Sequence, residues 1–100
     1  MLTCWDGSSA YLCSAAVNDD AWHHVAATVD ASTGDGTLYV DGSREKTFST
    51  NLSLAPDDRY TIGAEYDGQS LSDFLGGRID ELRVYDRALS GSEVSKLYNQ

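Results

Sequence analysis

The sequence has little positive charge, a single proline and no long apolar run. Its 7 lysines and arginines stand against 16 acidic residues, giving a net charge of −9, so a nucleic-acid-binding face, which needs clustered basic side chains, is not expected. No stretch of about 18 apolar residues is present, and the N-terminus lacks a basic region followed by an apolar one, so neither a transmembrane helix nor a signal peptide is predicted. With 41% hydrophobic residues, the 100-residue chain is predicted to form one globular domain, 1–100.

The acidic residues are spread along the chain and are not gathered in a tail. Two interpretations of this charge are open. Acidic loops could hold a hard cation such as Ca²⁺, which prefers carboxylate and carbonyl oxygens. Alternatively, the negative charge only keeps the domain soluble.

Cysteine is scarce as well, because Cys4 and Cys13 are the only two in the chain. If Leu2–Trp5 and Tyr11–Ser14 form a hairpin with a symmetric register, Cys4 lies opposite Cys13, and such pairs approach closely enough for a disulfide. A bridge would fit an extracytoplasmic protein, whereas two free thiols in a cytosolic protein are the alternative. Without further ligating residues nearby, the two cysteines do not predict a zinc site.

Most of the chain is patterned as short strands separated by turn-forming residues. Trp22–Val29 alternates as a strand does, and a polar loop, Asp30–Gly36, follows it. Asp41–Gly42 separates the strand-like segments Thr37–Val40 and Ser43–Phe48. An Asp-Gly pair in this position predicts a β-hairpin, because both residues of its turn need positive φ.

The second half of the chain continues this pattern. Asn51–Asp58 is predicted to be a loop, Arg59–Ala64 a short strand and Glu65–Asp73 a polar loop. Gly76–Gly77 then opens a longer predicted strand, Arg78–Tyr85. Short strands with frequent turns predict an all-β protein, either a sandwich or a barrel.

One helix is predicted, at the C-terminal end. Ser90 is a favourable N-cap residue and Glu93 completes a capping box, while Leu89 and Val94 have the spacing of a hydrophobic staple. A helix this short is marginal on its own, so it is expected to pack on the sheet. Its apolar stripe would consist of Val94, Leu97 and Tyr98.

Four segments in order resemble the laminin G-like branch of the concanavalin A-like lectin/glucanase superfamily. They are Trp22-His23-His24-Val25-Ala26, Leu38-Tyr39-Val40-Asp41-Gly42, Gly77-Arg78-Ile79-Asp80-Glu81-Leu82-Arg83-Val84-Tyr85 and Ala88-Leu89-Ser90. The resemblance, which extends from Ala21 to Tyr98, implies an antiparallel β-sandwich of the jelly-roll type with a short C-terminal helix. It also implies a secreted or cell-surface protein that binds carbohydrate, an extracellular protein or calcium.

The chain departs from this family at its N-terminal end, where several further strands usually precede the Trp-His-His segment. The chain is therefore expected to be a shortened version or a fragment. In a jelly roll the first strands pair with the last ones, so their loss leaves sheet edges uncovered, and uncovered edges pair readily with other chains. We therefore expect a homodimer that completes its sheets by edge pairing or strand exchange.

Asp80 is the candidate metal ligand. In the predicted strand, alternation places it on the same face as Leu82 and Val84. A carboxylate on an apolar face is costly unless it is paired, binds a metal or accepts backbone hydrogen bonds. Asp80 is interpreted either as a calcium ligand assisted by backbone carbonyls or as a structural carboxylate that ties down a neighbouring loop.

His23 and His24 are adjacent, so on a strand they face opposite sides of the sheet and cannot bind one metal together. By the resemblance both are structural, and one is expected to bond a backbone group.

The sequence predicts no catalytic site. The glucanase relatives use carboxylates arranged Glu-x-Asp-x-x-Glu or Glu-x-Asp-x-Glu on one strand, and neither pattern is present. Asp80 and Glu81 would point to opposite faces and could not act on one glycosidic bond. Neither a Gly-x-Ser-x-Gly motif nor a glycine-rich phosphate loop is found.

The polar loop Glu65–Asp73 is the candidate ligand-binding segment. An aromatic side chain there could stack on a sugar ring while polar side chains hydrogen-bond the hydroxyl groups; the alternative is an ordinary solvated connection. The candidate residues are Tyr60, Tyr66, Asp67, Gln69, Asp73 and Phe74.

These features predict a non-catalytic recognition module that binds carbohydrate or a protein surface. The alternatives are a structural domain that mainly self-associates and, third, the remnant of a glycoside hydrolase.

Overall fold

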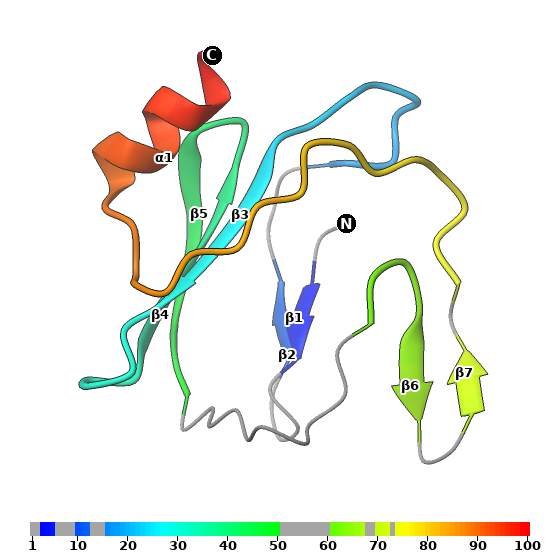
Figure 1. Cartoon of the computed structure of the whole chain (residues 1–100), viewed down its shortest axis with the longest axis horizontal. Helices are drawn as coiled ribbons and strands as arrows, with labels where there is room; N and C mark the ends of the chain where they lie inside the picture. Colours follow the sequence, from blue (N-terminus) through cyan, green and yellow to red (C-terminus); the bar gives the residue numbers. More distant parts are fainter. Residues whose placement is uncertain (1–2, 6–9, 13–15, 51–60, 68–69, 73) are drawn as a thin grey trace. The chain divides into compact units, whose positions relative to one another are not determined.

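The computed structural model describes residues 3–5, 10–12, 16–50, 61–67, 70–72 and 74–100 (Figure 1). The chain forms two compact units. This division does not test the prediction of a single domain, which stays a prediction. The first unit comprises Met1–Ser53 with Tyr85–Gln100, and the second comprises Leu54–Val84.

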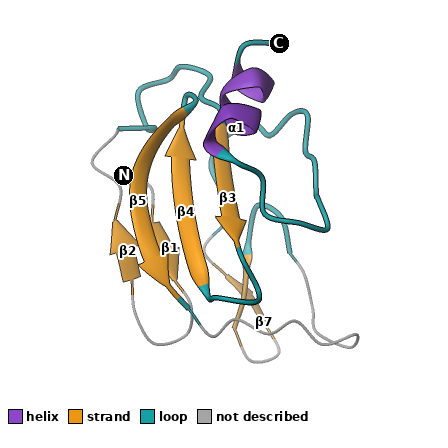
Figure 2. Ribbon diagram, turned by 90° about the vertical axis from the view of Figure 1, so that its left-hand side faces the viewer, coloured by secondary structure: helices purple, strands orange, loops and turns teal. Residues whose placement is uncertain are grey.

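A three-stranded antiparallel sheet is the centre of the first unit (Figure 2). Its strands are β3 (Val25–Val29), β4 (Asp35–Val40) and β5 (Ser43–Ser49), in the order β3-β4-β5. Val40 pairs with Ser43 across the two-residue turn Asp41–Gly42, whose φ angles are 50° and 80°. Two successive positive φ values define the type I′ hairpin turn, so the hairpin predicted at Asp41–Gly42 is confirmed.

The boundaries of two strands differ from the prediction. β3 begins at Val25, not Trp22, and Trp22 is 67% exposed. β4 begins at Asp35, inside the segment predicted as a loop, because Asp30 N–H donates to the carbonyl of Asp35 at 2.8 Å and extends the ladder. The register between β4 and β5 shifts by one residue between Leu38 and Tyr39.

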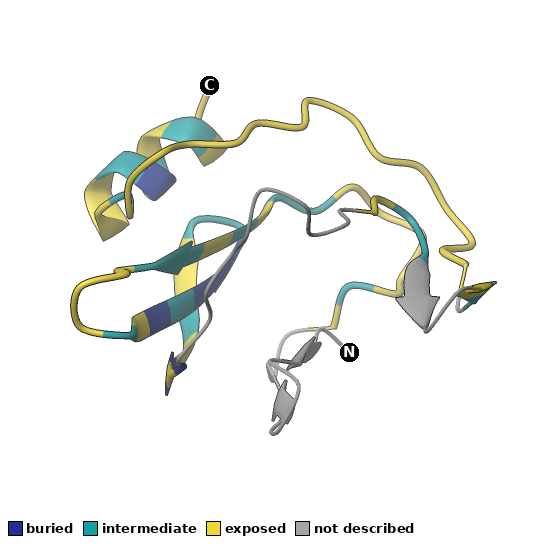
Figure 3. Ribbon diagram, turned by 60° about the horizontal axis from the view of Figure 1, so that its bottom comes forward, coloured by how far each residue is buried: buried dark blue, intermediate teal, exposed yellow. Residues whose placement is uncertain are grey.

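The core of the first unit is small and centred on β4 (Figure 3). Gly36 pairs with Phe48, and a Cβ at Gly36 would lie only 2.3 Å from the Phe48 ring, so the missing side chain makes room for the aromatic ring. The buried hydrophobic residues among those described are Leu38, Tyr39, Val40, Phe48 and Val94.

The C-terminal helix α1 (Gly91–Tyr98) forms as predicted. Glu93 N–H donates to Ser90 Oγ at 3.2 Å and Ser90 N–H donates to Glu93 Oε1 at 3.0 Å, which completes the capping box. Val94 is fully buried, and Tyr98 lies close to Gly42 of the hairpin turn. These contacts confirm that α1 packs on the sheet.

A second hairpin lies in the N-terminal part of the first unit. It consists of β1 (Thr3–Trp5) and β2 (Ala10–Leu12), and Cys4 pairs with Tyr11. The residue opposite Cys4 is thus Tyr11, two positions before Cys13 in the sequence. The register that placed Cys4 opposite Cys13 is therefore wrong. Cys13 lies outside the described residues, so the disulfide stays a prediction.

The second unit contains a hairpin where a loop was predicted. β6 (Glu65–Asp67) pairs antiparallel with β7 (Ser70–Ser72), with Asp67 opposite Ser70. The prediction of a loop over Glu65–Asp73 is therefore wrong, because the turn-forming residues separate two short strands. The predicted strand Arg59–Ala64 is also wrong in its described part, since residue 61 is irregular and residues 62–64 form bends.

The predicted strand Arg78–Tyr85 is wrong as well, because the whole segment is irregular and exposed. Glu81 has a φ of 52°, which no strand residue adopts. Leu82 is 58% exposed and Val84 89% exposed. A strand exists only with a hydrogen-bonded partner, and none of the described strands pairs with this segment.

The described strands are therefore all antiparallel, and α1 is the one helix among the described residues. Within the same part of the chain, no helix has the length and apolar character needed to cross a membrane.

Candidate functional site

The side chain of Asp41 ties the β4–β5 turn to the chain entering β3. Oδ1 of Asp41 accepts a hydrogen bond from the backbone N–H of His24 at 2.9 Å, and Oδ2 lies 2.8 Å from Nδ1 of His23. The backbone N–H of Asp41 donates in turn to the carbonyl of His24 at 2.8 Å. The turn and the start of β3 are therefore held together by three hydrogen bonds.

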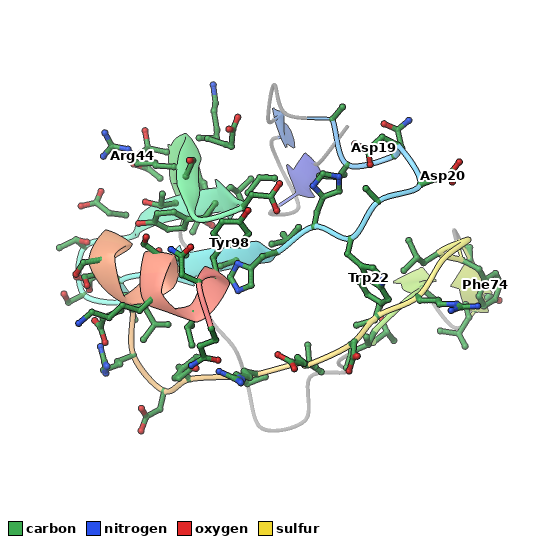
Figure 4. The ribbon with its side chains drawn as sticks, turned by 90° about the horizontal axis from the view of Figure 1, so that it is seen from above. Asp19, Asp20, Trp22, Arg44, Phe74 and Tyr98 are labelled. Atoms are coloured by element: carbon green, nitrogen blue, oxygen red, sulfur yellow. The ribbon has the colours of Figure 1, made fainter. Side chains whose placement is uncertain are left out.

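His23 lies between two carboxylates. Its Nε2 is 2.8 Å from Oδ1 of Asp19, which lies with Asp20 on the bend that leads into β3 (Figure 4). The His23 side chain is only 16% exposed, whereas those of Asp41 and Asp19 are 34% and 49% exposed. We call these three residues the Asp19–His23–Asp41 cluster.

The electrostatics of this cluster favour the charged histidine. Hydrogen bonds to Asp41 and then to Asp19 raise the pKa of His23 above its ordinary value of 6.5. The same bonds lower the pKa of Asp41 and of Asp19 below the ordinary 3.8, and the His24 N–H lowers that of Asp41 further. Because a carboxylate only accepts hydrogen bonds, both ring nitrogens must donate, and only imidazolium can do so.

This geometry leaves His23 no free ring nitrogen for general-base catalysis or metal binding. The residue therefore connects Asp19 to the hairpin turn, as a structural histidine does. The backbone bond that the resemblance implies for one of the two histidines is not made by the ring of His23, whose partners are carboxylates. The closeness of Asp41 follows from the β3–β4 register, because one residue beyond the pair Val25↔Val40 places His24 opposite Asp41. No sequence pattern indicates that Asp19 is the second partner.

His24 lies at the junction between β3 and α1. Its ring centroid is 6.0 Å from that of Tyr98, with the planes inclined at 50°. Its Nδ1 atom is buried without a hydrogen-bond partner in the described structure. His24 therefore supports the docking of α1 mainly through ring packing.

The β3–β4 ladder shows which backbone groups of β3 bond to β4. Asp30 bonds Asp35 at one end of the ladder and His24 bonds Asp41 at the other. Hydrogen-bonded and non-hydrogen-bonded pairs alternate in antiparallel strands. The even-numbered residues of β3 therefore face β4.

The odd-numbered residues of β3 consequently form its outer edge. The N–H and C=O groups of Val25, Ala27 and Val29 point away from β4, and among the described strands β3 ends the order of its sheet. Val25 is 47% exposed and Ala27 is also exposed. The first unit thus presents an apolar strand edge, which we call the β3 edge and define by Val25, Ala27 and Val29.

The structure describes three of the six predicted ligand-binding residues. Tyr66 and Asp67 lie in β6, opposite Leu71 and Ser70. Phe74 follows the hairpin and is 70% exposed. The other three candidates, Tyr60, Gln69 and Asp73, lie outside the described residues, so their role stays a prediction.

Asp80 does not have the environment that suggested a calcium ligand. The segment is no strand, so the apolar face shared with Leu82 and Val84 does not exist, and Asp80 is exposed. Its Oδ1 accepts the backbone N–H of Glu81 at 2.7 Å. Among the described residues, no three His, Cys, Asp or Glu side chains converge on a point where a metal could bind.

Comparison with known proteins gives two curated relatives of the chain. It is 31% identical over 84 residues to Paraclostridial mosquitocidal protein 1 from Paraclostridium bifermentans. The matched region covers 83% of this chain and 6% of that protein. It is 28% identical over 88 residues to the sushi, von Willebrand factor type A, EGF and pentraxin domain-containing protein 1 of Rattus norvegicus, covering 81% of the chain and 2% of that protein. The chain therefore spans only a small part of both relatives.

A solved structure is similar in fold. It is the crystal structure of residues 221–444 of an S-layer domain-containing protein from Clostridium thermocellum, with a TM-score of 0.73 and 29% sequence identity. The similarity covers 90% of this chain and 45% of that one. None of these three descriptions names an enzymatic activity.

The family model Laminin_G_3, described as the concanavalin A-like lectin/glucanases superfamily, matches residues 2–95. This match covers most of the chain and includes all of the segments that carry the resemblance. The chain belongs to the laminin G-like family of the concanavalin A-like lectin/glucanases superfamily.

Proposed function

We propose that this chain is a non-catalytic recognition module of a secreted or cell-surface protein, and that it binds a protein or carbohydrate surface. Its membership of the laminin G-like family and its similarity to an S-layer domain-containing protein support this function. In the whole protein we expect the chain to form part of a jelly-roll sandwich.

One observation in the second unit carries the proposal. From Phe74 to Val84, five large apolar side chains are at least half exposed. Large exposed apolar surfaces usually mark an interaction site, so exposed apolar side chains that recur along one segment make this segment a candidate. The residues are Phe74 (70%), Leu75 (55%), Ile79 (50%), Leu82 (58%) and Val84 (89%).

The composition of this segment favours a protein surface as the partner. Four of the five side chains are aliphatic, and aliphatic groups bind by displacing water from another apolar surface. Arg78, Asp80 and Arg83 add charged groups of both signs, as the rim of a protein interface does. This segment can therefore form both the apolar and the polar part of such a contact.

Carbohydrate is the second candidate, favoured by the aromatic residues near the β6–β7 hairpin. Phe74 is 70% exposed, and an exposed aromatic ring offers an apolar face on which a sugar ring can stack. Tyr66 lies in the same hairpin. The polar candidates Asp67, Gln69 and Asp73 would then bond the sugar hydroxyl groups.

A binding comparison with matched variants tests the proposal. The chain is applied to a glycan array and to immobilised extracellular proteins of its source organism. For a protein partner, Val84→Ser and Leu82→Ser are expected to weaken binding at least about tenfold, a loss of about 1.4 kcal/mol; for a carbohydrate, Tyr66→Ala has this effect. Ile62→Ser, at a residue 63% exposed outside this segment, is the control, and binding to neither array overturns the proposal.

A further inference from the structure

The two outer edges of the β3-β4-β5 sheet differ in chemistry. β3 consists of Val25, Ala26, Ala27, Thr28 and Val29 and has no charged side chain. β5 carries Arg44, Glu45 and Lys46, and β2 lies beside it. Charged side chains and covering segments are the usual means of preventing edge-to-edge association. The β5 side has both, whereas the β3 edge has no charged side chain to block pairing.

The sequence of β3 is also nearly symmetric about its centre. If two β3 strands run antiparallel with Ala27 on a two-fold axis, Val25 of each copy lies opposite Val29 of the other. Ala26 then lies opposite Thr28 of the other copy. No like charges oppose one another, and the β-branched valines form favourable cross-strand pairs.

We propose that the β3 edge pairs with the β3 edge of a second copy of this chain, antiparallel and centred on Ala27. This inference goes beyond the proposed function, because it concerns the sheet of the first unit and not the exposed segment of the second. The resulting interface is isologous, because each copy contributes the same residues.

The backbone geometry fits this register. The N–H and C=O groups of Val25, Ala27 and Val29 point to the outer edge, so the pairs centred on Ala27 are hydrogen-bonded pairs that exchange both bonds. The even-numbered residues keep their bonds to β4. Dimerisation therefore extends the three-stranded sheet across the axis without breaking any hydrogen bond described above.

Long-range electrostatics oppose this association. Each copy carries a net charge of −9, and the repulsion between two such copies falls as salt screens it. The dimer is therefore expected to strengthen with ionic strength. An association driven by pairs of opposite charge would weaken under the same conditions.

Sedimentation equilibrium of the chain from micromolar to millimolar concentration tests the pairing. The wild type is expected to show a reversible monomer–dimer equilibrium that shifts towards dimer in about 1 M salt, where the screening length falls to about 3 Å. Ala27→Lys places two like charges on the axis and should raise the dimer Kd at least about tenfold. Thr47→Lys is the matched control, because it adds the same charge at an exposed position on β5, and its Kd should equal that of the wild type.

Circular dichroism and thermal melting confirm that both variants remain folded. A wild type that stays monomeric at all concentrations and salts overturns the pairing. A dimer that is weakened equally by both lysine variants, or by neither, also overturns it. If the monomer still binds a glycan or an extracellular protein, the pairing alone is wrong and the recognition function stands.

Discussion

Nδ1 of His23 lies 2.8 Å from Oδ2 of Asp41, although the two residues are 18 positions apart in the chain. This contact joins His23, two residues before β3, to the turn between β4 and β5. Because Asp41 also accepts the His24 N–H, the contact fixes the direction in which the chain enters β3. The β3 edge is thus held in place at its N-terminal end by the Asp19–His23–Asp41 cluster.

The stability of the first unit should depend on pH through this cluster. The pKa of His23 is raised, so its contribution is fully present below about 6.5 and is lost as the pH rises through the folded-state pKa. The pKa values of Asp19 and Asp41 are lowered from 3.8, so their contribution is lost as the pH falls through their folded-state values. Melting temperature should therefore be highest between about pH 4 and pH 6.5.

Asp41→Asn is the control for this pH dependence, because asparagine tolerates the positive φ of the turn but carries no charge. In this variant the pKa of His23, followed by NMR of its ring protons, should move back towards 6.5. A His23 pKa that is the same in both proteins would contradict the role of Asp41.

Gly42→Ala should destabilise the hairpin. The residue has a φ of 80°, and a Cβ there would lie 2.9 Å from Cδ1 of Tyr98. Left-handed backbone costs an L-residue about 1–2 kcal/mol, and the contact with α1 adds to this. A fall in melting temperature of roughly 4–16 °C is expected from that cost.

Gly76→Ala is the matched control for Gly42→Ala, because a Cβ at Gly76 would have no neighbour within 4 Å. Its effect should stay within about 0.5 kcal/mol. Equal melting temperatures for the two variants would show that neither the positive φ nor the approach of Tyr98 constrains the turn.

Calcium should have no effect through Asp80. The exposed carboxylate accepts one local N–H bond from Glu81, and no group of three His, Cys, Asp or Glu side chains that could hold a metal occurs among the described residues. Any change in melting temperature that millimolar calcium produces should therefore be the same in the wild type and in Asp80→Asn. A rise of several degrees in the wild type that is absent from the variant would establish a calcium site at Asp80.

Local signals predicted the parts of the fold that depend on neighbouring residues. Asp41–Gly42 specifies its turn through the φ values that those two residues tolerate. Ser90 and Glu93 define the start of α1 because their mutual hydrogen bonds span three positions. Such features form with little help from distant parts of the chain.

The parts that depend on distant partners could not be predicted in this way. In Arg78–Tyr85, apolar and charged residues alternate much as they do in a strand, but a strand also needs another strand to pair with. The hairpin of β6 and β7 was missed because its strands are short and polar. The contact of Asp19 with His23 depends on how the chain bends before β3, and alternation carries no information about that bend.

Hydrogen exchange of the β3 amides, at low and high protein concentration, tests most directly whether this chain acts through an open strand edge. In dilute solution, the amides of Val25, Ala27 and Val29 should exchange fast while those of Ala26 and Thr28 are protected by β4. At high concentration the first three should become protected as well. Protection of all five amides in the dilute monomer, or fast exchange of the three edge amides at every concentration, would contradict the account.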